Sequence, residues 1–438
     1  MRPGGRELSA LSDVSPELSG PDLDEAVRQL VQNAKNGARG LSIASTEAKN
    51  RVLTSVAAGI RRGAQGIEEA NLVDVEGARA KGSDAAFIDR LTLTGARIEA
   101  LAKSVDEIVL LDDPCGRVIE ERVRPNGLLV RRIAVPIGLV AMVYEARPNV
   151  TVDAAVLCIK SGNGTVLKGG REALATSTQL AAIVGDALEA NGFSRSAVTL
   201  LPFTNRAAVR ALVRLDGLVD LAIPRGGEAL IRAVVDEARV PVVQHYKGVC
   251  HLYLDAGADL EMATRLVLNG KLQRPGTCNS TECLLVDAAD APRLVPPVLE
   301  ALAAAGCTLH ACGKTRELFP AALPATDDDW GREFLAPTLA VRIVDGLDGA
   351  LAHIATYGSG HTEAICTPHA THAQRWRHEV DAACVVVNAS TRFHDGGELG
   401  LGAEMGIATS RLHWRGPMGL EALTTMKWVV DGEGHVRA

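Results

Sequence analysis

Short, apolar, β-branched runs that alternate with longer helical segments are the feature that most constrains the fold of this chain. From residue 128 onward, runs such as TVLK, AVTLL and AVRIV alternate with segments whose apolar residues recur at helical spacing. Strands that are apolar on both faces are typical of parallel sheets covered by helices on both sides. The sequence therefore predicts an α/β fold with doubly wound sheets, and the ligand of the first sheet is expected outside the carboxyl ends of its strands.

The same pattern divides the chain into two α/β domains and two smaller parts. From Asp24 to Val105 the apolar spacing is helical throughout. Much later, residues 240–245 (VPVVQH) predict the last strand of the first domain. Pro-Asn-Gly in VIEERVRPNGLLVRRIAV indicates a hairpin, which the terminal stretch MKWVVDGEGHVR extends into a flap. We expect a disordered tail over 1–22, a first domain over 23–118 and 137–247, a second domain over 248–423, and the flap over 119–136 and 424–438.

The bulk composition excludes several classes of partner. The net charge is −7 and no block of lysine and arginine is present, so no nucleic-acid footprint is expected. No apolar run reaches the ~18 residues of a membrane span, and residues 1–22 lack the apolar core of a signal peptide. The nine cysteines are scattered without CxxC pairs, which is typical of a reducing compartment. We expect a cytoplasmic protein that binds neither nucleic acid nor membrane.

Cys307, His310 and Cys312 come closest to a metal-binding cluster. They lie in Cys-Thr-Leu-His-Ala-Cys, which alternates like a strand and lacks a matching second pair of ligands. Zinc at this place is the alternative to an ordinary strand. No metal is expected in the chain.

Cys278 is the candidate nucleophile. It lies in QRPGTCNSTE, a loop between a helix and a strand, where Gly276 permits unusual backbone angles and backbone amides can point inward. Lys271 and Arg274 are close enough in sequence to stabilise a thiolate, which is the nucleophilic form of cysteine. A buried, inert thiol is the alternative.

Two glycine-rich strand ends are candidates for nucleotide binding. At the carboxyl end of one predicted strand, two cations and a glycine pair suit a ribose 2′-phosphate or a pyrophosphate, and a second strand end places a glycine pair before a helix. Solvated basic residues in ordinary turns are the alternative. The candidate residues are Lys168, Gly169, Gly170 and Arg171 at the first strand end, and Pro224, Arg225, Gly226 and Gly227 at the second.

Three further polar loops suit an anionic, amino-acid-like substrate. They lie at Tyr144–Asn149, Tyr357–Thr362 and Asn388–Gly397, and each by itself could be a structural turn. Together they offer hydrogen-bond donors and cations of the kind that bind carboxylates and phosphates. The candidate residues are Arg147, Asn149, His361, Asn388, Ser390, Thr391 and Arg392.

These motifs occur together and in a fixed order. The chain contains, one after another, VPIGLVAMVYEARPNVTVDAA, KSGNGTVLKGGREA, IPRGG, QRPGTCNSTE, YGSGHTEAI and NASTRFHDGGELGLGAEMGIATSRLHWRGPMGLEALTTMKW. In this order and spacing they resemble the gamma-glutamyl phosphate reductase family, a divergent branch of the aldehyde dehydrogenase superfamily. The resemblance runs from about Asp24 to the C-terminus and leaves out only the tail.

The resemblance implies an NADP-binding first domain, a catalytic second domain and an oligomerisation flap, hence a homo-oligomer. It implies NADPH-dependent reduction of L-glutamyl 5-phosphate to L-glutamate 5-semialdehyde, with Cys278 as catalytic cysteine and with Asn149 as a donor to the oxyanion. Lys168 departs from the arginine of the family pattern but matches the cofactor lysine of the wider superfamily. The resemblance also implies a separate glutamate 5-kinase as supplier of the substrate, since no kinase domain is present.

Gln244 lies near the place where hydrolytic aldehyde dehydrogenases carry a glutamate base. A glutamine cannot take a proton from water at neutral pH, so a thioester on Cys278 is expected to persist. An ordinary aldehyde dehydrogenase and a non-catalytic nucleotide-binding scaffold are the competing hypotheses. For the substrate we expect Arg274 and Lys271 at the phosphate, and Arg392 and Arg415 at the α-carboxylate, from their places in the sequence.

Overall fold

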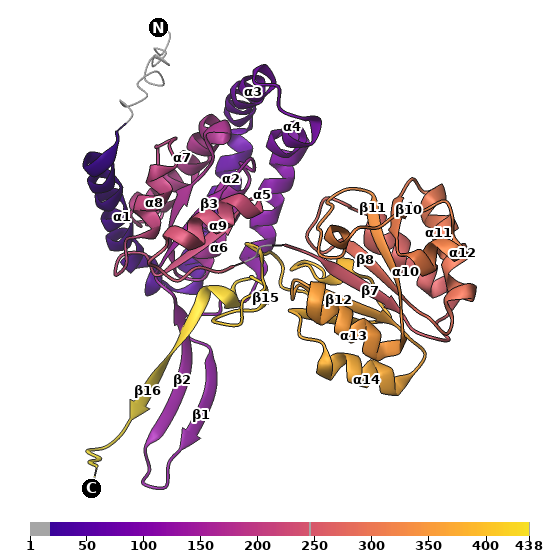
Figure 1. Cartoon of the computed structure of the whole chain (residues 1–438). Helices are drawn as coiled ribbons and strands as arrows, with labels where there is room; N and C mark the ends of the chain where they lie inside the picture. The colour runs from indigo at the N-terminus through magenta and orange to yellow at the C-terminus, as the bar shows by residue number, and fades with distance from the viewer. Residues whose placement is uncertain (1–17, 245–246, 438) are drawn as a thin grey trace. The chain divides into compact units, whose positions relative to one another are not determined.

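The structure, a computed structural model, describes residues 18–244 and 247–437, and the chain folds into two compact units. Unit 1 comprises residues 1–242 and 423–438, and unit 2 comprises residues 243–422. Each unit has its own parallel sheet, and unit 1 also carries a small antiparallel sheet (Figure 1). The predicted α/β fold class with two parallel sheets and a small β-flap is therefore confirmed.

Unit 1 is built mainly of helices around its parallel sheet. Its helices are α1 (Gly20–Ser42), α2 (Thr46–Arg62), α3 (Ala64–Ala80), α4 (Ala85–Leu91), α5 (Gly95–Leu110), α6 (Val150–Lys160), α7 (Leu174–Ala190), α8 (Ala207–Val213) and α9 (Glu228–Glu237). Its strands are β1 (Val118–Val123), β2 (Leu129–Pro136), β3 (Leu139–Tyr144), β4 (Gly164–Lys168), β5 (Val198–Leu200), β6 (Leu221–Arg225) and β16 (Thr424–Asp431).

The parallel sheet of unit 1 has the strand order β5-β4-β3-β6. Its central strand β3 is buried along its whole length, because alternate side chains face opposite helix layers. On one face Leu139, Ala141 and Val143 pack with apolar residues of α1, α8 and α9. Helix α6 also contacts β3 and β4 and packs in turn against α2, α5 and α7. Both faces of the sheet are thus closed to solvent, and its strand ends are left for ligands.

Strands β1, β2 and β16 form the antiparallel flap in which β2 is central (Figure 1). The hairpin predicted around Pro-Asn-Gly pairs Val123 with Leu129, and the terminal strand pairs along the whole of β2. On β16 the apolar side chains of Met426, Trp428 and Val430 are more than half exposed. Because they alternate along the strand, they share one face of it.

Unit 2 contains a seven-stranded sheet flanked by helices. Its helices are α10 (Leu260–Leu272), α11 (Ala291–Ala304), α12 (Gly313–Leu318), α13 (Gly346–Tyr357) and α14 (Ala370–Glu379). Its strands are β7 (Cys250–Leu254), β8 (Thr281–Asp287), β9 (Thr308–Ala311), β10 (Leu323–Pro324), β11 (Thr338–Val344), β12 (Thr362–Cys366), β13 (Cys384–Val387) and the short pair β14 (Ile407–Ala408) and β15 (Gly416–Pro417).

The seven strands of unit 2 have the order β10-β9-β11-β8-β7-β12-β13 and are all parallel. One face packs against α10 and α11, with Leu252, Leu284 and Ala364 in that core. The other face packs against α13 and α14, where Tyr253 stacks on the fully buried Trp376. Alternate residues of each central strand therefore belong to two separate hydrophobic cores.

Some predicted elements differ from the structure. The strand predicted for VPVVQH is wrong within the described residues, where Val242 makes only an isolated bridge with Ala222 and where Pro241 lacks the N–H that a ladder needs. The helical stretch before Val105 is broken, because Ser45, Asp84 and Thr94 each cap the start of a new helix with their side chains.

The predicted tail over 1–22 falls mostly outside the described residues. Gly20, Pro21 and Asp22 already belong to α1, whose first buried residue is Leu23. No helix within 18–244 and 247–437 is both long enough and apolar enough to cross a membrane.

Candidate active site

Cys278 lies in the loop between α10 and β8 of unit 2, at the amino-terminal edge of the parallel sheet. Its side chain is half-buried. Gly248, which precedes β7, packs directly on its backbone, so that a Cβ at Gly248 would lie only 2.8 Å from the Cys278 Cα and closer still to the carbonyl oxygen. Gly276 has no left-handed φ, so the unusual backbone angles expected there are not found. The close approach of Gly248 positions the loop instead.

The Cys278 backbone is also held from the interior of unit 2. Its carbonyl oxygen accepts a hydrogen bond from the thiol of Cys250, with 3.2 Å between sulfur and oxygen. Burial raises the pKa of the Cys250 thiol well above its usual value, so it remains a donor. His361 Nδ1 lies 3.5 Å from the Cys250 sulfur and 2.7 Å from the Thr362 hydroxyl. His361 is fully buried in this structure, and its role as a substrate ligand stays a prediction.

Arg392 is the cation that the fold brings to the cysteine loop from a distant part of the chain. Its Nη1 donates to the hydroxyl of Thr277, the neighbour of Cys278, at 2.9 Å, and its Nε donates to Gln273 at 2.9 Å. Burial lowers the pKa of Arg392, but a guanidinium keeps its proton at neutral pH. Arg274 is exposed in the same loop. Both arginines can therefore act on an anion at Cys278.

Lys271 is turned into the interior of unit 2 and does not lie on its surface. Its side chain is fully buried, and its ammonium lies 2.5 Å from the carboxylate of Glu282 on β8. Burial raises the pKa of Glu282 to about 7, against the opposing effect of Lys271. This ion pair would have to open before Lys271 could reach a phosphate group, so its role as a phosphate ligand stays a prediction.

Three of the predicted substrate residues make hydrogen bonds to other residues of unit 2. The Asn388 amide donates to the Thr367 carbonyl and accepts from the Thr367 N–H, at 2.9 and 2.8 Å, with the left-handed φ of 54° that asparagine tolerates. Ser390 is buried and accepts from the Arg392 N–H, while the buried Thr391 hydroxyl lies 3.1 Å from that of Thr281. These three residues shape the loop that carries Arg392, and their role as substrate ligands stays a prediction.

Arg415 is also engaged within unit 2. Its Nη1 donates to the carboxylate of Asp381 at 2.7 Å, and Arg411 pairs with the same carboxylate. Two cations thus share one anion, which leaves net positive charge at this surface. Arg415 therefore stays a candidate for a substrate carboxylate.

In unit 1 the candidate cofactor residues gather at the carboxyl ends of β3, β4 and β6. The strand register pairs Val143 with Lys168 and Tyr144 with Arg225, so the ends of the three strands are level. Lys168 is buried, its Nζ donates to the Gly169 carbonyl at 2.7 Å, and burial lowers its pKa while Glu172 opposes that shift. Arg171, at the next turn, is exposed. Three cations, counting Arg225, thus lie at one edge of the sheet.

Of the four candidate glycines at this edge, Gly227 is the one with open space beside its backbone. A Cβ at Gly169 would lie 3.2 Å from the Tyr144 ring, whereas a Cβ at Gly227, which precedes α9, would meet nothing within 4 Å. Gly170 and Gly226 are each crowded by a carboxylate side chain, from Glu172 and Glu145. Pro224 lies within β6 itself.

Asn149 and Arg147 follow β3 at the same edge. The Asn149 amide donates to the Asp153 carboxylate at 2.9 Å. Burial raises the pKa of Asp153 to about 6, against the opposing effect of this bond. Arg147 is exposed, after Ala146, whose N–H donates to Glu172. Asn149 thus has one amide hydrogen committed and one left for an oxyanion.

The sequence interpretation missed the residues that hold the cysteine loop in place. Asn279 donates to the His394 carbonyl at 3.0 Å, and Thr277 binds Arg392 as described above. Both flank Cys278 in the sequence, which was the available signal, whereas nothing local pointed to Gly248. Cys307, His310 and Cys312 do not bring their ligand atoms together in the described part of the chain, whereas those of His251, Cys283 and His353 all lie within 4.8 Å of one another.

Comparison with solved structures first defines the class. An acetylating aldehyde dehydrogenase from Geobacillus thermoglucosidasius matches 95% of the chain and 98% of its own, with a TM-score of 0.68 at 18% identity. A glyceraldehyde-3-phosphate dehydrogenase from Methanocaldococcus jannaschii, complexed with NADP, matches 96% of both chains with a TM-score of 0.68 at 16% identity. The chain has the aldehyde dehydrogenase fold.

Closer relatives define the family. A gamma-glutamyl phosphate reductase from Thermotoga maritima matches 94% of this chain and 100% of its own, with a TM-score of 0.93 and 42% identity. A gamma-glutamyl phosphate reductase from Sorangium cellulosum is 54% identical over 426 residues, 96% of this chain and 100% of the relative. No model of a protein family matches the sequence. The chain belongs to the gamma-glutamyl phosphate reductase family, which confirms the resemblance drawn from its motifs.

Proposed function

We propose that the chain reduces L-glutamyl 5-phosphate to L-glutamate 5-semialdehyde with NADPH, releases phosphate, and carries the acyl group on Cys278 as a thioester. This is the second step of proline synthesis from glutamate. The observation that carries the proposal is the Cys278 loop, a half-buried thiol on a backbone fixed by Gly248 and flanked by Arg274 and Arg392. The names of the relatives support the substrate.

In the first half of the reaction, the Cys278 thiolate attacks the acyl carbon and the carbon–oxygen bond to phosphate breaks. Phosphate leaves with the bonding electron pair and needs little help from an acid. Arg274 and Arg392 stabilise both the thiolate and the departing phosphate by their charge. The N–H of Cys278 and the Asn149 amide are the proposed donors to the tetrahedral oxyanion.

In the second half, the thioester gains a hydride and becomes a thiohemiacetal anion. The carbon–sulfur bond then breaks, which releases the aldehyde and returns the thiolate. Gln244 cannot act as a base towards water, so the thioester waits for reduction rather than hydrolysis. Its backbone carbonyl accepts from the Thr409 N–H at 3.1 Å, which fixes the chain at this point.

The carboxyl edge of the unit 1 sheet fits a nicotinamide dinucleotide phosphate. Lys168, Arg171 and Arg225 supply positive charge for phosphate groups, and the glycines at 169, 170, 226 and 227 present backbone without side chains. The bound cofactor supplies the hydride for the second half of the reaction. The NADP complex of the glyceraldehyde-3-phosphate dehydrogenase neighbour supports the choice of a nicotinamide cofactor.

The remaining partners follow from the chemistry of the substrate. An acyl phosphate is labile in water, so a glutamate 5-kinase on a separate chain is the proposed supplier. The apolar face of β16 in the flap suits assembly into a homo-oligomer. A cytoplasmic site of action agrees with nine cysteines for which a disulfide is not needed.

The reverse reaction tests the proposal. Purified enzyme receives glutamate semialdehyde and NADP⁺, and NADPH formation is followed with and without phosphate or arsenate. We expect NADPH only when one of the two anions is present, because phosphate must cleave the thioester. Equal rates without either anion would indicate an ordinary aldehyde dehydrogenase that forms the free acid.

The Cys278→Ser variant tests the nucleophile in the same assay. We expect a loss of at least ~10³-fold in turnover, since the hydroxyl of serine is not ionised at neutral pH. Cys384→Ser is the matched control, because Cys384 is also half-buried in unit 2. Activity retained by Cys278→Ser would support a non-catalytic scaffold.

A further inference from the structure

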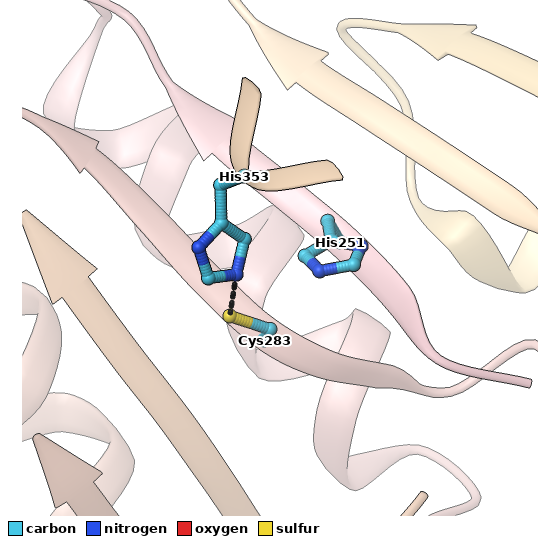
Figure 2. Close-up of side chains that lie close together, drawn as sticks. All are labelled: His251, Cys283 and His353. Atoms are coloured by element: carbon cyan, nitrogen blue, oxygen red, sulfur yellow. Dashed lines mark hydrogen bonds between the residues drawn. The ribbon is translucent and has the colours of Figure 1, made fainter. Parts of the chain in front are cut away.

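Three metal-ligating side chains converge in the core of unit 2, away from the cysteine loop. His251 on β7, Cys283 on β8 and His353 on α13 each offer one ligand atom, and the three atoms all lie within 4.8 Å of one another (Figure 2). The residues are 0%, 1% and 5% exposed. They come from two adjacent strands and from the helix that packs on that face of the sheet, so the fold holds them rigidly.

One ring nitrogen of His251 is buried near the Cys283 thiol without a hydrogen bond of ordinary geometry. Its Nδ1 lies 2.8 Å from the carboxylate of Glu363, which fixes the orientation of the ring. Its Nε2 is buried and has no hydrogen-bond partner among the described residues. A buried polar atom without a partner costs free energy, and a metal ion is one group that would satisfy it. Metal-bound histidines commonly pair their second nitrogen with a carboxylate in this manner.

The distance between Cys283 and His353 also suits a metal. The Cys283 sulfur lies 3.7 Å from His353 Nε2, which is long for a hydrogen bond between these groups (Figure 2). Zinc bonds of about 2.3 Å to sulfur and about 2.0–2.1 Å to nitrogen place the two ligand atoms about 3.6 Å apart in a tetrahedron. The pair is thus already spaced as two corners of a zinc site.

Arg342 is the group that metal binding must displace. Its Nη1 lies 3.2 Å from His353 Nδ1, a contact that places the ring proton on Nε2. Metal binding at Nε2 moves that proton to Nδ1, so the guanidinium must turn away from the ring. Its centre also lies 5.2 Å from the ring of Trp330, where the cation keeps a favourable contact.

We propose that His251, Cys283 and His353 form a binding site for zinc, with the Glu363 carboxylate orienting the His251 ring through its Nδ1. Two imidazoles and one thiolate are ligands that zinc prefers, and a water molecule takes the fourth position. The site joins β7, β8 and α13, so zinc stabilises unit 2. It is independent of the reaction at Cys278.

Metal titration of the full chain tests this proposal. The Cys278→Ser variant serves as the starting protein, because it lacks the half-buried thiol that could bind metal by itself. After treatment with a chelator it is titrated with Co²⁺, then with Zn²⁺ in competition with a coloured chelator. We expect one equivalent of each metal, and a thiolate-to-cobalt charge-transfer band in the near ultraviolet.

Two ligand variants and one matched control assign the site. Adding Cys283→Ser or His353→Gln should weaken zinc binding at least ~10-fold, and Cys283→Ser should abolish the charge-transfer band. Cys366→Ser is the control, since Cys366 is equally buried in the same sheet but belongs to the core on the opposite face. It should bind zinc as the starting protein does.

The proposal fails if the starting protein shows no charge-transfer band. It also fails if Cys283→Ser leaves the zinc affinity unchanged. It fails likewise if Cys366→Ser lowers the zinc affinity as much as Cys283→Ser does, because the loss then reflects damage to the hydrophobic core. Circular dichroism and thermal unfolding confirm that each variant is folded. None of these readouts depends on reductase activity, so they stay informative whether or not the proposed reaction is correct.

Discussion

The two parallel sheets of this protein present their candidate site residues at opposite ends. In unit 1 these residues follow the carboxyl ends of β3, β4 and β6, where Gly227 leads into the first turn of α9. In unit 2 Cys278 precedes β8, at the end where α10 has just finished at Leu272. Helix N-termini carry about +0.5 charge and C-termini about −0.5. The same architecture therefore offers an anion opposite environments.

This difference determines how much positive charge the side chains of each unit must provide for an anion. At the unit 1 edge, backbone N–H groups can help to bind a phosphate. At the unit 2 edge, Cys278 follows the end of α10 and has no helix N-terminus directly after it, so we expect the positive charge to come from Arg274 and Arg392. We therefore expect unit 2 to be more sensitive than unit 1 to small changes in side-chain geometry, as the predictions below test in order of decreasing effect.

Gly248→Ala should give the largest effect among these changes. The added Cβ would lie 2.8 Å from the Cys278 Cα, so the nucleophile loop must move, and displacement by about 1 Å costs on the order of 10²-fold in turnover. Steady-state kinetics of the reverse reaction measures the loss. Gly313→Ala is the control, because a Cβ there meets nothing within 4 Å. Turnover within about twofold of wild type would show that the loop is not fixed by Gly248.

Arg392→Lys should follow, because an ammonium cannot replace the two donors that reach Gln273 and Thr277. We expect kcat/KM to fall about 10–30-fold. Alkylation of Cys278, followed by mass spectrometry of its peptide, should shift to higher pH because the thiolate loses support. Arg375→Lys, an exposed ion-pair residue on α14, should change neither. An unchanged pH profile would remove Arg392 from the stabilisation of the thiolate.

Lys168→Gln should affect cofactor use without changing the thiol. We expect KM for NADPH to rise about 10-fold, since a charged donor to a phosphate is lost. The alkylation profile of Cys278 should stay as in wild type, which separates the tasks of the two sheet edges. Lys103→Gln, on the exposed face of α5, is the control. Equal KM values for NADPH in Lys168→Gln and wild type would contradict the assignment.

Asp153→Asn comes last, because its expected effect is on stability. Burial raises the pKa of Asp153 to about 6, above the ~3.9 of an unfolded chain. The stability due to its neutral form is thus complete below about pH 4 and is lost as the pH rises to about 6. The asparagine variant does not suffer this loss, so between pH 4 and pH 7 it should gain on the order of 3 kcal/mol relative to wild type, since one pKa unit corresponds to about 1.4 kcal/mol.

Thermal unfolding at both pH values measures the effect of Asp153→Asn. The exposed Asp216→Asn is the control and should show no such dependence on pH. A gain that is equal at pH 4 and pH 7 would mean that the carboxyl does not titrate in this range. In that case the Asp153 carboxyl beside Asn149 does not carry a proton at pH 4 that it loses by pH 7.

Most of the fold could be predicted because its signals are local. Strands such as β3 and β12 are apolar on both faces, and the Pro-Asn-Gly turn specifies the β1–β2 hairpin. The strand predicted at VPVVQH failed because pairing depends on the neighbouring strand, and only Val242 has a bridge there. An apolar β-branched run cannot show by itself whether a partner is available.

The site was predictable only in part, because proximity in sequence is a poor guide to direction in space. Lys271 is seven residues before Cys278, yet it points into the core and pairs with Glu282. Arg392 is far along the chain and reaches the residue next to Cys278. The proposed zinc ligands His251, Cys283 and His353 lie on three separate elements of the fold, so no local sequence motif could predict them.

The position of β2 between β1 and β16 has a practical consequence for making the protein. A truncation that removes β16 would turn β2 into an edge strand with a free row of N–H and C=O groups. Such an edge is a template for aggregation. Expression vectors that place an affinity tag or a cleavage site at the C-terminus should therefore keep residues 424–431 intact, and a tag at the N-terminus is the safer choice for this sheet.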